Sequence, residues 1–269
     1  MPTTAIRSVA NFREVGGLPT TDGGRVQRGL LYRSGALTAV TPEDAEALQR
    51  LRIRTVYDLR TNWERDDAPD QLPDGARYVH ADIVARMGPN GPGQLSAVMA
   101  DPSRARAMLG EGRGTAMWME QYRSFVVEDG VRQAFGRVFV ELATVDGRPA
   151  LLHCSTGKDR TGWAVAALLW LLGVPDELVM RDYLASQRRL KPFLGPALAR
   201  WEQRGGDPRL LAPIFAARRT YLEAGRREMV EAFGTVERYF LEGMGVPAET
   251  QHALREAFLE RVPQAAAAS

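Results

Sequence analysis

The sequence uses cysteine and lysine very sparingly. Cys154 is the only cysteine in 269 residues, which excludes a disulfide within the chain and argues against a zinc site. Among the 35 basic residues only Lys158 and Lys191 are lysines, and all the others are arginines. One of the two lysines nevertheless lies just after the cysteine. Chance is one explanation; the other is that this position needs a compact ammonium group, which a planar guanidinium would replace poorly.

Long hydrophobic runs and a strong excess of one charge are also lacking. The formal net charge is +2 at pH 7, which gives no indication of a nucleic-acid-binding or polybasic membrane protein. No apolar run approaches the roughly 20 residues that cross a bilayer, and residues 1–17 lack the apolar stretch of a secretory signal. We expect a monomeric protein without nucleic-acid partners or an integral membrane segment, located in the cytoplasm or exported without a cleaved signal.

The pattern of apolar residues predicts a single α/β domain over residues 1–269, in which helices pack on a sheet. The hydrophobic content of 45% is ample for a core. Early segments favour strands, late segments favour helices, and a strand–loop–helix unit lies between them. Strands are expected in a β-hairpin region at 11–37 and at 54–59, 78–83 and 149–153, and helices at 41–51, 116–127, 131–143, 161–172, 175–190 and in several segments of 207–261.

Residues 85–114 form a long stretch with many glycines, prolines and methionines. Two short helices could fit into it, at 94–100 and 103–109. A weakly ordered insertion of this length in a compact domain is either disordered or functional, commonly as a lid. We expect a helical lid, which would shield a reactive thiol from oxidation; a mobile surface loop is the alternative.

The residues that follow Cys154 have the pattern of an anion-binding loop. Cys154 and Arg160 enclose five residues, Gly157 allows a tight turn, and an apolar helix begins at once. If the five residues curl into a ring, their backbone N–H groups point inward and the helix N-terminus adds partial positive charge. The arginine can donate two hydrogen bonds to a phosphate. We expect the phosphate to be bound by Ser155, Thr156, Gly157, Lys158, Asp159 and Arg160.

The same environment suits a nucleophilic cysteine. A free thiol with a pKa of about 8.5 is only a few per cent thiolate at neutral pH, and the ring, the helix dipole and the nearby cations all favour the anion. Thr161 is placed to donate a hydrogen bond to the sulfur when it leaves a phosphocysteine. His153 is expected to brace the loop through hydrogen bonds and not to act as a base. The prediction is two-step hydrolysis of a phosphate monoester without a metal or cofactor; a small buried hydrophobe is the alternative for Cys154, but it does not explain the residues that follow.

The run HCSTGKDRTG resembles the signature loop of the protein tyrosine phosphatases. It is similar above all to the bacterial tyrosine and phosphoinositide phosphatases of the mycobacterial phosphatase B group. The resemblance implies a central, mainly parallel sheet of four to five strands, a two-helix lid over the site, and hydrolysis of phosphotyrosine, with phosphoserine, phosphothreonine and phosphoinositides as further candidate substrates. Other family-like landmarks are Asn11-Phe12-Arg13, Leu31-Tyr32-Arg33-Ser34, Asp58-Leu59-Arg60 with Glu64, and Asp182-Tyr183-Leu184.

The general acid stays open between two residues. Many tyrosine phosphatases carry this acid on a separate Trp-Pro-Asp loop, and the present sequence has no such triplet. The candidates are Asp159 inside the loop and Asp82 after a predicted strand. The resemblance favours Asp159, although a structural acceptor that fixes the loop is the alternative for this residue.

Neighbouring charged residues are expected to adjust substrate choice and to support the loop. Lys158 at the rim would favour multiply phosphorylated head groups. We expect salt bridges that support the loop from Arg13, Arg33, Asp58 and Arg60. Direct contact with the substrate is the alternative for these residues.

Three other classes of protein compete with this interpretation. A catalytically silent phosphate-binding module normally lacks the cysteine, the arginine or the loop acid, and all three are present here. A rhodanese-like sulfurtransferase also uses one loop cysteine but generally lacks the Gly-Lys-Asp-Arg-Thr run. A serine or metal phosphatase would need a ligand cluster that the sequence does not show.

Overall fold

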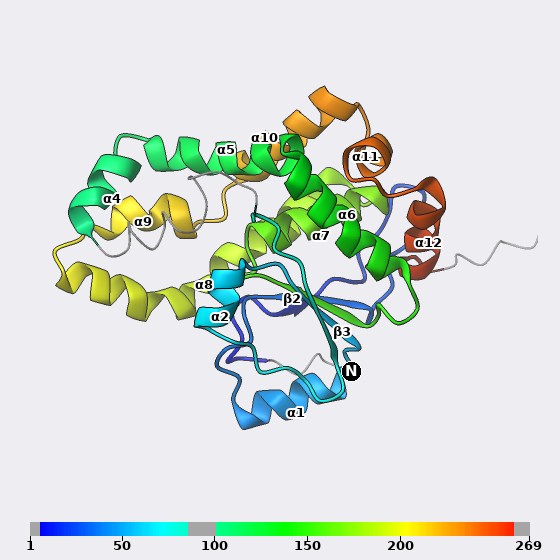
Figure 1. Ribbon diagram of the computed structural model, residues 1–269, viewed down its shortest axis with the longest axis horizontal. Helices are drawn as coiled ribbons and strands as arrows, with labels where there is room; N and C mark the ends of the chain where they lie inside the picture. The colour runs from blue at the N-terminus through cyan, green and yellow to red at the C-terminus, as the bar shows by residue number, and fades with distance from the viewer. Residues whose placement is uncertain (1–5, 86–100, 261–269) are drawn as a thin grey trace, which may run out of the picture.

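A five-stranded sheet forms the centre of the protein (Figure 1). The computed structural model describes residues 6–85 and 101–260, and the statements below concern those residues. The strands are arranged in the order β1-β2-β5-β3-β4, with β1 antiparallel to β2 and the other neighbours parallel. The expected mainly parallel α/β sheet is therefore confirmed. The strands are β1 (Arg13–Glu14), β2 (Leu31–Ser34), β3 (Thr55–Asp58), β4 (Arg77–His80) and β5 (Ala150–His153).

The middle strand β5 is buried on both faces of the sheet. Its apolar residues Ala150, Leu151 and Leu152 follow one another without alternation, as is usual for a strand covered on both sides. Successive side chains of a strand point to opposite faces. Leu151 packs with Leu48 of helix α1, whereas Leu152 belongs to the larger cluster on the other face, which includes Trp163. The two faces of the sheet thus have separate cores, and the central strand joins them.

Helices cover both faces, with α1 alone on one side of the sheet in Figure 1 and α5, α6 and α7 on the other. No helix in the described ranges is long and apolar enough to cross a membrane. The helices are α1 (Pro42–Arg50), α2 (Asn62–Asp67), α4 (Pro102–Leu109), α5 (Arg113–Val127), α6 (Asp129–Ala143), α7 (Arg160–Leu171), α8 (Asp176–Gln203), α9 (Pro208–Phe215), α10 (Arg219–Phe233), α11 (Val236–Arg238), the π-helical turn η1 (Tyr239–Gly243) and α12 (Ala248–Phe258).

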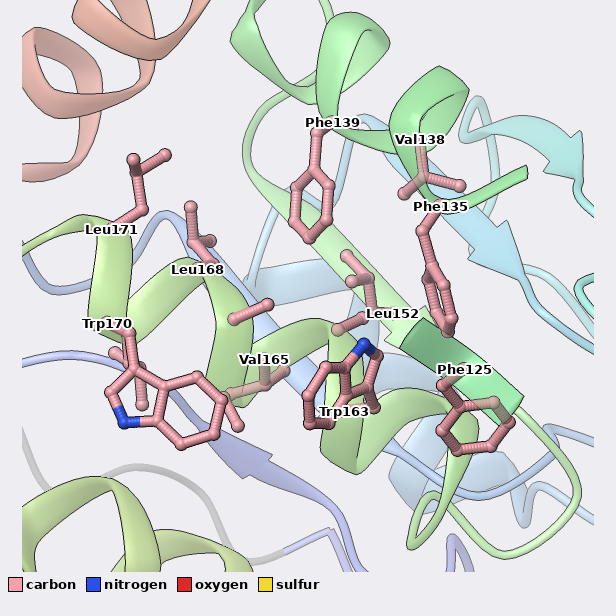
Figure 2. Packing of buried hydrophobic residues seen from close by; sticks show 14 of the residues in the cluster. Phe125, Phe135, Val138, Phe139, Leu152, Trp163, Val165, Leu168, Trp170 and Leu171 are labelled. Carbon is pink, nitrogen blue, oxygen red and sulfur yellow. The ribbon is translucent and has the colours of Figure 1, made fainter. Parts of the chain in front are cut away.

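Helix α7 is the buried centre of the helical layer. Every residue from Thr161 to Leu171 is buried, so the helix has an apolar surface all round instead of a single stripe. The fully buried Trp163 ring lies 6.4 Å from the Phe125 ring and 6.1 Å from the Tyr239 ring, between centroids. Figure 2 shows Trp163 between Leu152 of β5 and Phe125 of α5. This packing fixes the direction in which the N-terminus of α7 points.

Most expected elements are present, with two differences in the helices. Helix α2 was not predicted because it is only six residues long. Helix α8 continues to Gln203, past the expected end at residue 190, although it contains Pro192 and Pro196. Both prolines lie on the exposed surface, where water can bind the backbone carbonyl groups that lose their N–H partner.

The described part of the 85–114 insertion belongs to a helical arm that extends to one side of the sheet (Figure 1). The helix expected at 103–109 is confirmed as α4, whereas the one expected at 94–100 lies outside the described residues. Helix α4 packs through Ala105 and Leu109 against Trp201 at the end of α8 and Leu211 of α9. The lid itself stays a prediction.

Gly136 of α6 marks a close approach between α6 and η1, and it provides a test of the packing. A Cβ atom at this position would lie 2.0 Å from the backbone oxygen of Met244. We expect Gly136→Ala to lower the free energy of unfolding by about 3 kcal/mol, because backbone must move to relieve the overlap. Alanine's better helix propensity, about 1 kcal/mol, offsets only part of that cost.

The matched control is Arg137→Ala on the exposed face of the same helix. It should change the free energy of unfolding by no more than about 0.5 kcal/mol in urea denaturation. Equal stability of the two variants would show that α6 and η1 are not packed as described.

Candidate active site

The loop with the cysteine begins at the carboxyl edge of the sheet. Its strand β5 lies between β2 and β3, with His153 paired to Ser34 on one side and to Asp58 on the other. Cys154 follows directly and is 2% exposed. The loop ends at Arg160, the first residue of α7. The crevice at the carboxyl ends of parallel strands is where α/β proteins bind ligands, so topology places Cys154 at a natural binding position.

The carbonyl groups of the loop are turned outward by hydrogen bonds. Asn11 donates through Nδ2 to the carbonyl oxygens of Thr156, at 3.2 Å, and Gly157, at 2.8 Å. Arg33 donates through Nη2 to the same Gly157 oxygen at 2.8 Å. Because a peptide N–H points opposite to its carbonyl, the N–H groups of Gly157 and Lys158 point away from Asn11 and Arg33. The orientation of these two peptide units is therefore set by residues outside the loop.

Gly157 occupies a position that only glycine can fill. Its φ angle is +65°, in the left-handed region. A Cβ atom would also lie 2.1 Å from the backbone oxygen of Ser34 in β2. The loop is thus pressed against the neighbouring strand at its turn.

A buried ion-pair network lies beneath the loop. Asp182 of α8 binds Arg33 at 2.6 Å and Arg13 at 2.8 Å. Burial alone would raise the pKa of Asp182, but the charges and hydrogen bonds of both arginines outweigh burial and lower this pKa to about 2. Ser186, one turn further along α8, accepts hydrogen bonds from both Arg13 and Asn11. These contacts hold the two residues that orient the loop carbonyls.

Arg160 is held by a carboxylate from α2. Glu64 binds Nη1 at 2.6 Å and Nη2 at 2.8 Å, and it also accepts a short hydrogen bond from the Ser155 hydroxyl. Burial alone would raise the pKa of Glu64, but the hydrogen bonds and charge of Arg160 outweigh burial and lower this pKa to about 2. Nε of Arg160 has no acceptor among the described residues, so the guanidinium can donate a hydrogen bond to a phosphate through this atom. Thr61 and Glu64 form a reciprocal capping box that begins α2.

The structure corrects the expected place of Lys158. The side chain is 1% exposed, and its ammonium does not lie at the rim of the site. The Nζ atom lies 2.7 Å from Oδ1 of Asp159 and 5.8 Å from the ring centroids of both Trp118 and Tyr221. The ammonium is thus enclosed by aromatic rings of α5 and α10, a geometry that attracts a cation, and it points toward the neighbouring carboxylate.

The two candidate acids lie in different surroundings. Asp159 accepts hydrogen bonds at Oδ1 from Lys158 and, at 3.1 Å, from the hydroxyl of Tyr122. Its side chain is 21% exposed, and Oδ2 has no donor among the described residues. Asp82 instead uses both oxygens on backbone N–H groups, those of Asn62 and Val84. The structure therefore leaves one oxygen of the loop residue Asp159 without a donor among the described residues, whereas Asp82 binds the backbone at the start of α2.

A second buried charge cluster lies behind the cysteine. Arg60 binds Asp58 at 2.8 Å and makes a short ion pair with Asp70, whose role could not be predicted because no local pattern marks it. The fully buried His153 has its ring nitrogens 3.9 Å from Asp58 and 3.3 Å from Asp70. Burial lowers the pKa of His153 more than these carboxylates raise it. Three of these side chains could be metal ligands, but Arg60 already places a cation between the carboxylates, so we interpret the group as an ion-pair cluster.

Thr161 follows Arg160 at the start of α7. Thr161 is fully buried in the first turn of α7, and its Oγ1 has no hydrogen-bond partner among the described residues. A buried hydroxyl without a partner is unfavourable unless a ligand or a neighbouring charge uses it. The site thus contains a buried thiol, two loop carbonyls bound from outside, an anchored guanidinium and a partly exposed carboxylate.

Comparison with known proteins assigns a family to this arrangement. The tyrosine phosphatase family model matches residues 4–260. A protein named a tyrosine-protein phosphatase from Cupriavidus necator is 34% identical over 244 residues, which cover 90% of this chain and 84% of that protein. The triple specificity protein phosphatase PtpB of Mycobacterium tuberculosis is 27% identical over 288 residues, which cover 93% and 96% of the two chains. The chain therefore belongs to the tyrosine phosphatase family and is a cysteine-dependent phosphatase, as its loop predicted.

Proposed function

We propose that Cys154 is the nucleophile of a two-step hydrolysis of phosphate monoesters. Its thiolate attacks phosphorus, the bond from phosphorus to the ester oxygen breaks, and this oxygen takes a proton from Asp159. Water then attacks the phosphocysteine, loses a proton to the same carboxylate and releases phosphate, which returns the thiolate. The observation that carries this proposal is that Asn11 and Arg33 bind the carbonyls of Thr156 and Gly157 from outside the loop that follows Cys154, which directs the N–H groups of Gly157 and Lys158 the other way.

The N–H groups and cations of the loop would stabilise both negative charges of the reaction, the thiolate and the phosphoryl oxygens. Backbone N–H groups and the N-terminus of the twelve-residue helix α7 stabilise the thiolate before attack. Arg160 and the same N–H groups stabilise the phosphoryl oxygens in the transition state. The unpaired hydroxyl of Thr161 donates a hydrogen bond to the sulfur as the phosphocysteine breaks down and the thiolate leaves. Glu64 keeps Arg160 in place, so no reorganisation is needed during the reaction.

Asp159 fits the role of general acid better than Asp82. A carboxylic acid carries its proton on the oxygen that is not already accepting hydrogen bonds, and Oδ2 of Asp159 meets this condition on the partly exposed side of the residue. Both oxygens of Asp82 instead accept hydrogen bonds from backbone N–H groups, those of Asn62 and Val84.

Phosphotyrosine on proteins is the substrate that we propose first. Phosphoserine, phosphothreonine and phosphoinositides follow, supported by the similarity to a phosphatase whose name describes triple specificity. The inward position of Lys158 removes it as a rim contact for lipid head groups. All the residues named come from one chain, so the proposal needs no second subunit. We place the action in a reducing compartment such as the cytoplasm, where a lone thiolate persists; export without a cleaved signal is the alternative.

The first prediction concerns the nucleophile. Cys154→Ser should lower the hydrolysis of para-nitrophenyl phosphate by about a thousandfold or more, because an alcohol is not ionised by this loop. The assay is run with a chelator and without added metal. The variant should still bind tungstate, as measured by the rise in its melting temperature, which would show that the loop is intact. Unchanged turnover in the variant would refute the proposed mechanism, and tungstate binding without any turnover by the natural chain would indicate a silent binding module.

The second prediction separates the two acids. Asp159→Asn should lower kcat/KM for phenyl phosphate about a hundredfold and leave para-nitrophenyl phosphate nearly unchanged, because only the poor leaving group needs a proton. The matched control Asp82→Asn should lower thermal stability and leave the ratio of the two substrates as it is. The opposite pattern in the two variants would assign the acid to Asp82.

The third prediction is an acid sensitivity that depends on Glu64. The pKa of this carboxyl is about 2 in the folded protein against a usual 4.5, so the ion pair stabilises the fold above pH 4.5 and is lost as the pH falls toward 2. This difference corresponds to about 3 kcal/mol. We expect Glu64→Gln to flatten the loss of unfolding free energy between pH 5 and pH 3, measured in urea. Glu141→Gln, in an exposed pair with Arg77, should leave that profile unchanged, and an identical acid slope in the Glu64 variant would contradict the prediction.

A further inference from the structure

Two buried tyrosine hydroxyls form a chain that ends on Asp159. The hydroxyl oxygens of Tyr183 and Tyr122 are 2.9 Å apart, and that of Tyr122 is 3.1 Å from Oδ1 of Asp159. Burial holds the pKa of Tyr122 well above its usual 10, and it also raises the pKa of Tyr183. Both hydroxyls therefore keep their protons. Tyr122 has a single hydroxyl proton for its two neighbours, Asp159 and Tyr183. A carboxylate is the stronger acceptor, and when Tyr122 donates to it, the contact between the two tyrosines requires Tyr183 to be the donor.

The ring of Tyr122 is held by its neighbours on all sides, so its hydroxyl has a fixed position. The residue is completely buried. Its ring centroid lies 5.4 Å from that of Phe125, 6.0 Å from that of Tyr183 and 6.1 Å from that of Tyr221. Helix α5, which carries Tyr122, packs along α10 and does not belong to the loop itself.

The carboxylate of Asp159 does not cap the helix that begins after it. Asp159 is the N-cap residue of α7, and aspartate at such a position normally accepts a hydrogen bond from a backbone N–H of the first turn. No such cap bond is formed here. Instead Oδ1 is turned toward Lys158 and Tyr122. The capping hydrogen bond is absent, and Oδ1 is used by both donors while Oδ2 has none among the described residues.

We propose that Tyr122 is a positioning residue for the general acid. Together with Lys158 it holds Oδ1 of Asp159, which leaves Oδ2 as the oxygen that carries and delivers the proton. Tyr183 orients the hydroxyl of Tyr122 by donating to it. This inference rests on the proposed role of Asp159 and assigns its orientation to a helix that is far from the loop in sequence.

The test is the dependence of kcat/KM on the leaving group in Tyr122→Phe. This variant removes one hydroxyl and keeps the ring. We expect kcat/KM for phenyl phosphate to fall about tenfold, because a misplaced acid transfers its proton poorly, while kcat/KM for para-nitrophenyl phosphate changes less than about twofold, since that leaving group needs little protonation. A purely structural role would lower both values together.

Tyr239→Phe is the matched control. The Tyr239 hydroxyl is equally buried and lies 3.2 Å from both the Phe125 carbonyl oxygen and Nε1 of Trp163, without contact to the loop. It should lower the melting temperature to a similar extent and leave the ratio of the two substrates unchanged. Tyr183→Phe, which keeps the Tyr122 hydroxyl, should give the same selective loss in weaker form, about threefold, and serves as the test if Tyr122→Phe does not fold.

The outcomes separate the two levels of the proposal. If Asp159→Asn is selective for the poor leaving group and Tyr122→Phe is not, the positioning role is wrong and the acid role stands. If Asp159→Asn shows no selectivity, the acid role fails and the positioning role fails with it. If Cys154→Ser stays active, the proposed mechanism itself is refuted.

Discussion

The outward pull on two loop carbonyls is the interaction on which the site depends. Asn11 and Arg33 bind the carbonyl oxygens of Thr156 and Gly157, and this contact decides which way the peptide units face. If these bonds were absent, a glycine-containing loop could rotate its peptides, and the N–H groups of Gly157 and Lys158 would lose the orientation on which the proposed phosphate binding depends. The close approach of Gly157 to β2 and the buried network around Asp182 serve the same purpose, because they keep the two donors and the turn in fixed positions.

The site also illustrates how buried charges are managed in a small volume. Each buried cation has a carboxylate partner: Arg160 has Glu64, Lys158 has Asp159 and Arg60 has Asp58. Desolvation would be costly for any one of these groups alone, so removing one partner is expected to disturb the other. Arg160 is oriented by a residue from another element, α2, whereas Lys158 and Arg60 pair with neighbours in the chain. The loop receives its geometry from α2, α5, α8 and β2 together.

Much of the site could be predicted because its chemistry is local. The order of a strand, a glycine-containing turn and an apolar helix places Cys154, Arg160 and Thr161 within one short loop, whatever the rest of the chain does. The supporting residues were harder to find. Glu64 follows Thr61 in a capping-box pattern, which could have indicated α2, but nothing in the sequence marks Asp70 or Tyr122. The expected rim position of Lys158 was wrong because a lysine's side chain can reach inward as easily as outward, and only the aromatic rings of α5 and α10 decide between the two.

The sequence by itself determined the class of fold, the loop and the residue types that face an anion, because periodicity and short-range turn chemistry act over a few residues. The tertiary structure alone decided which carboxylate binds Arg160, where the ammonium of Lys158 points and which helix contacts Asp159. These outcomes depend on contacts such as that between Tyr122 and Asp159, which join residues far apart in the chain. Contacts of this kind arise from the packing of whole elements, and a local pattern carries no information about them.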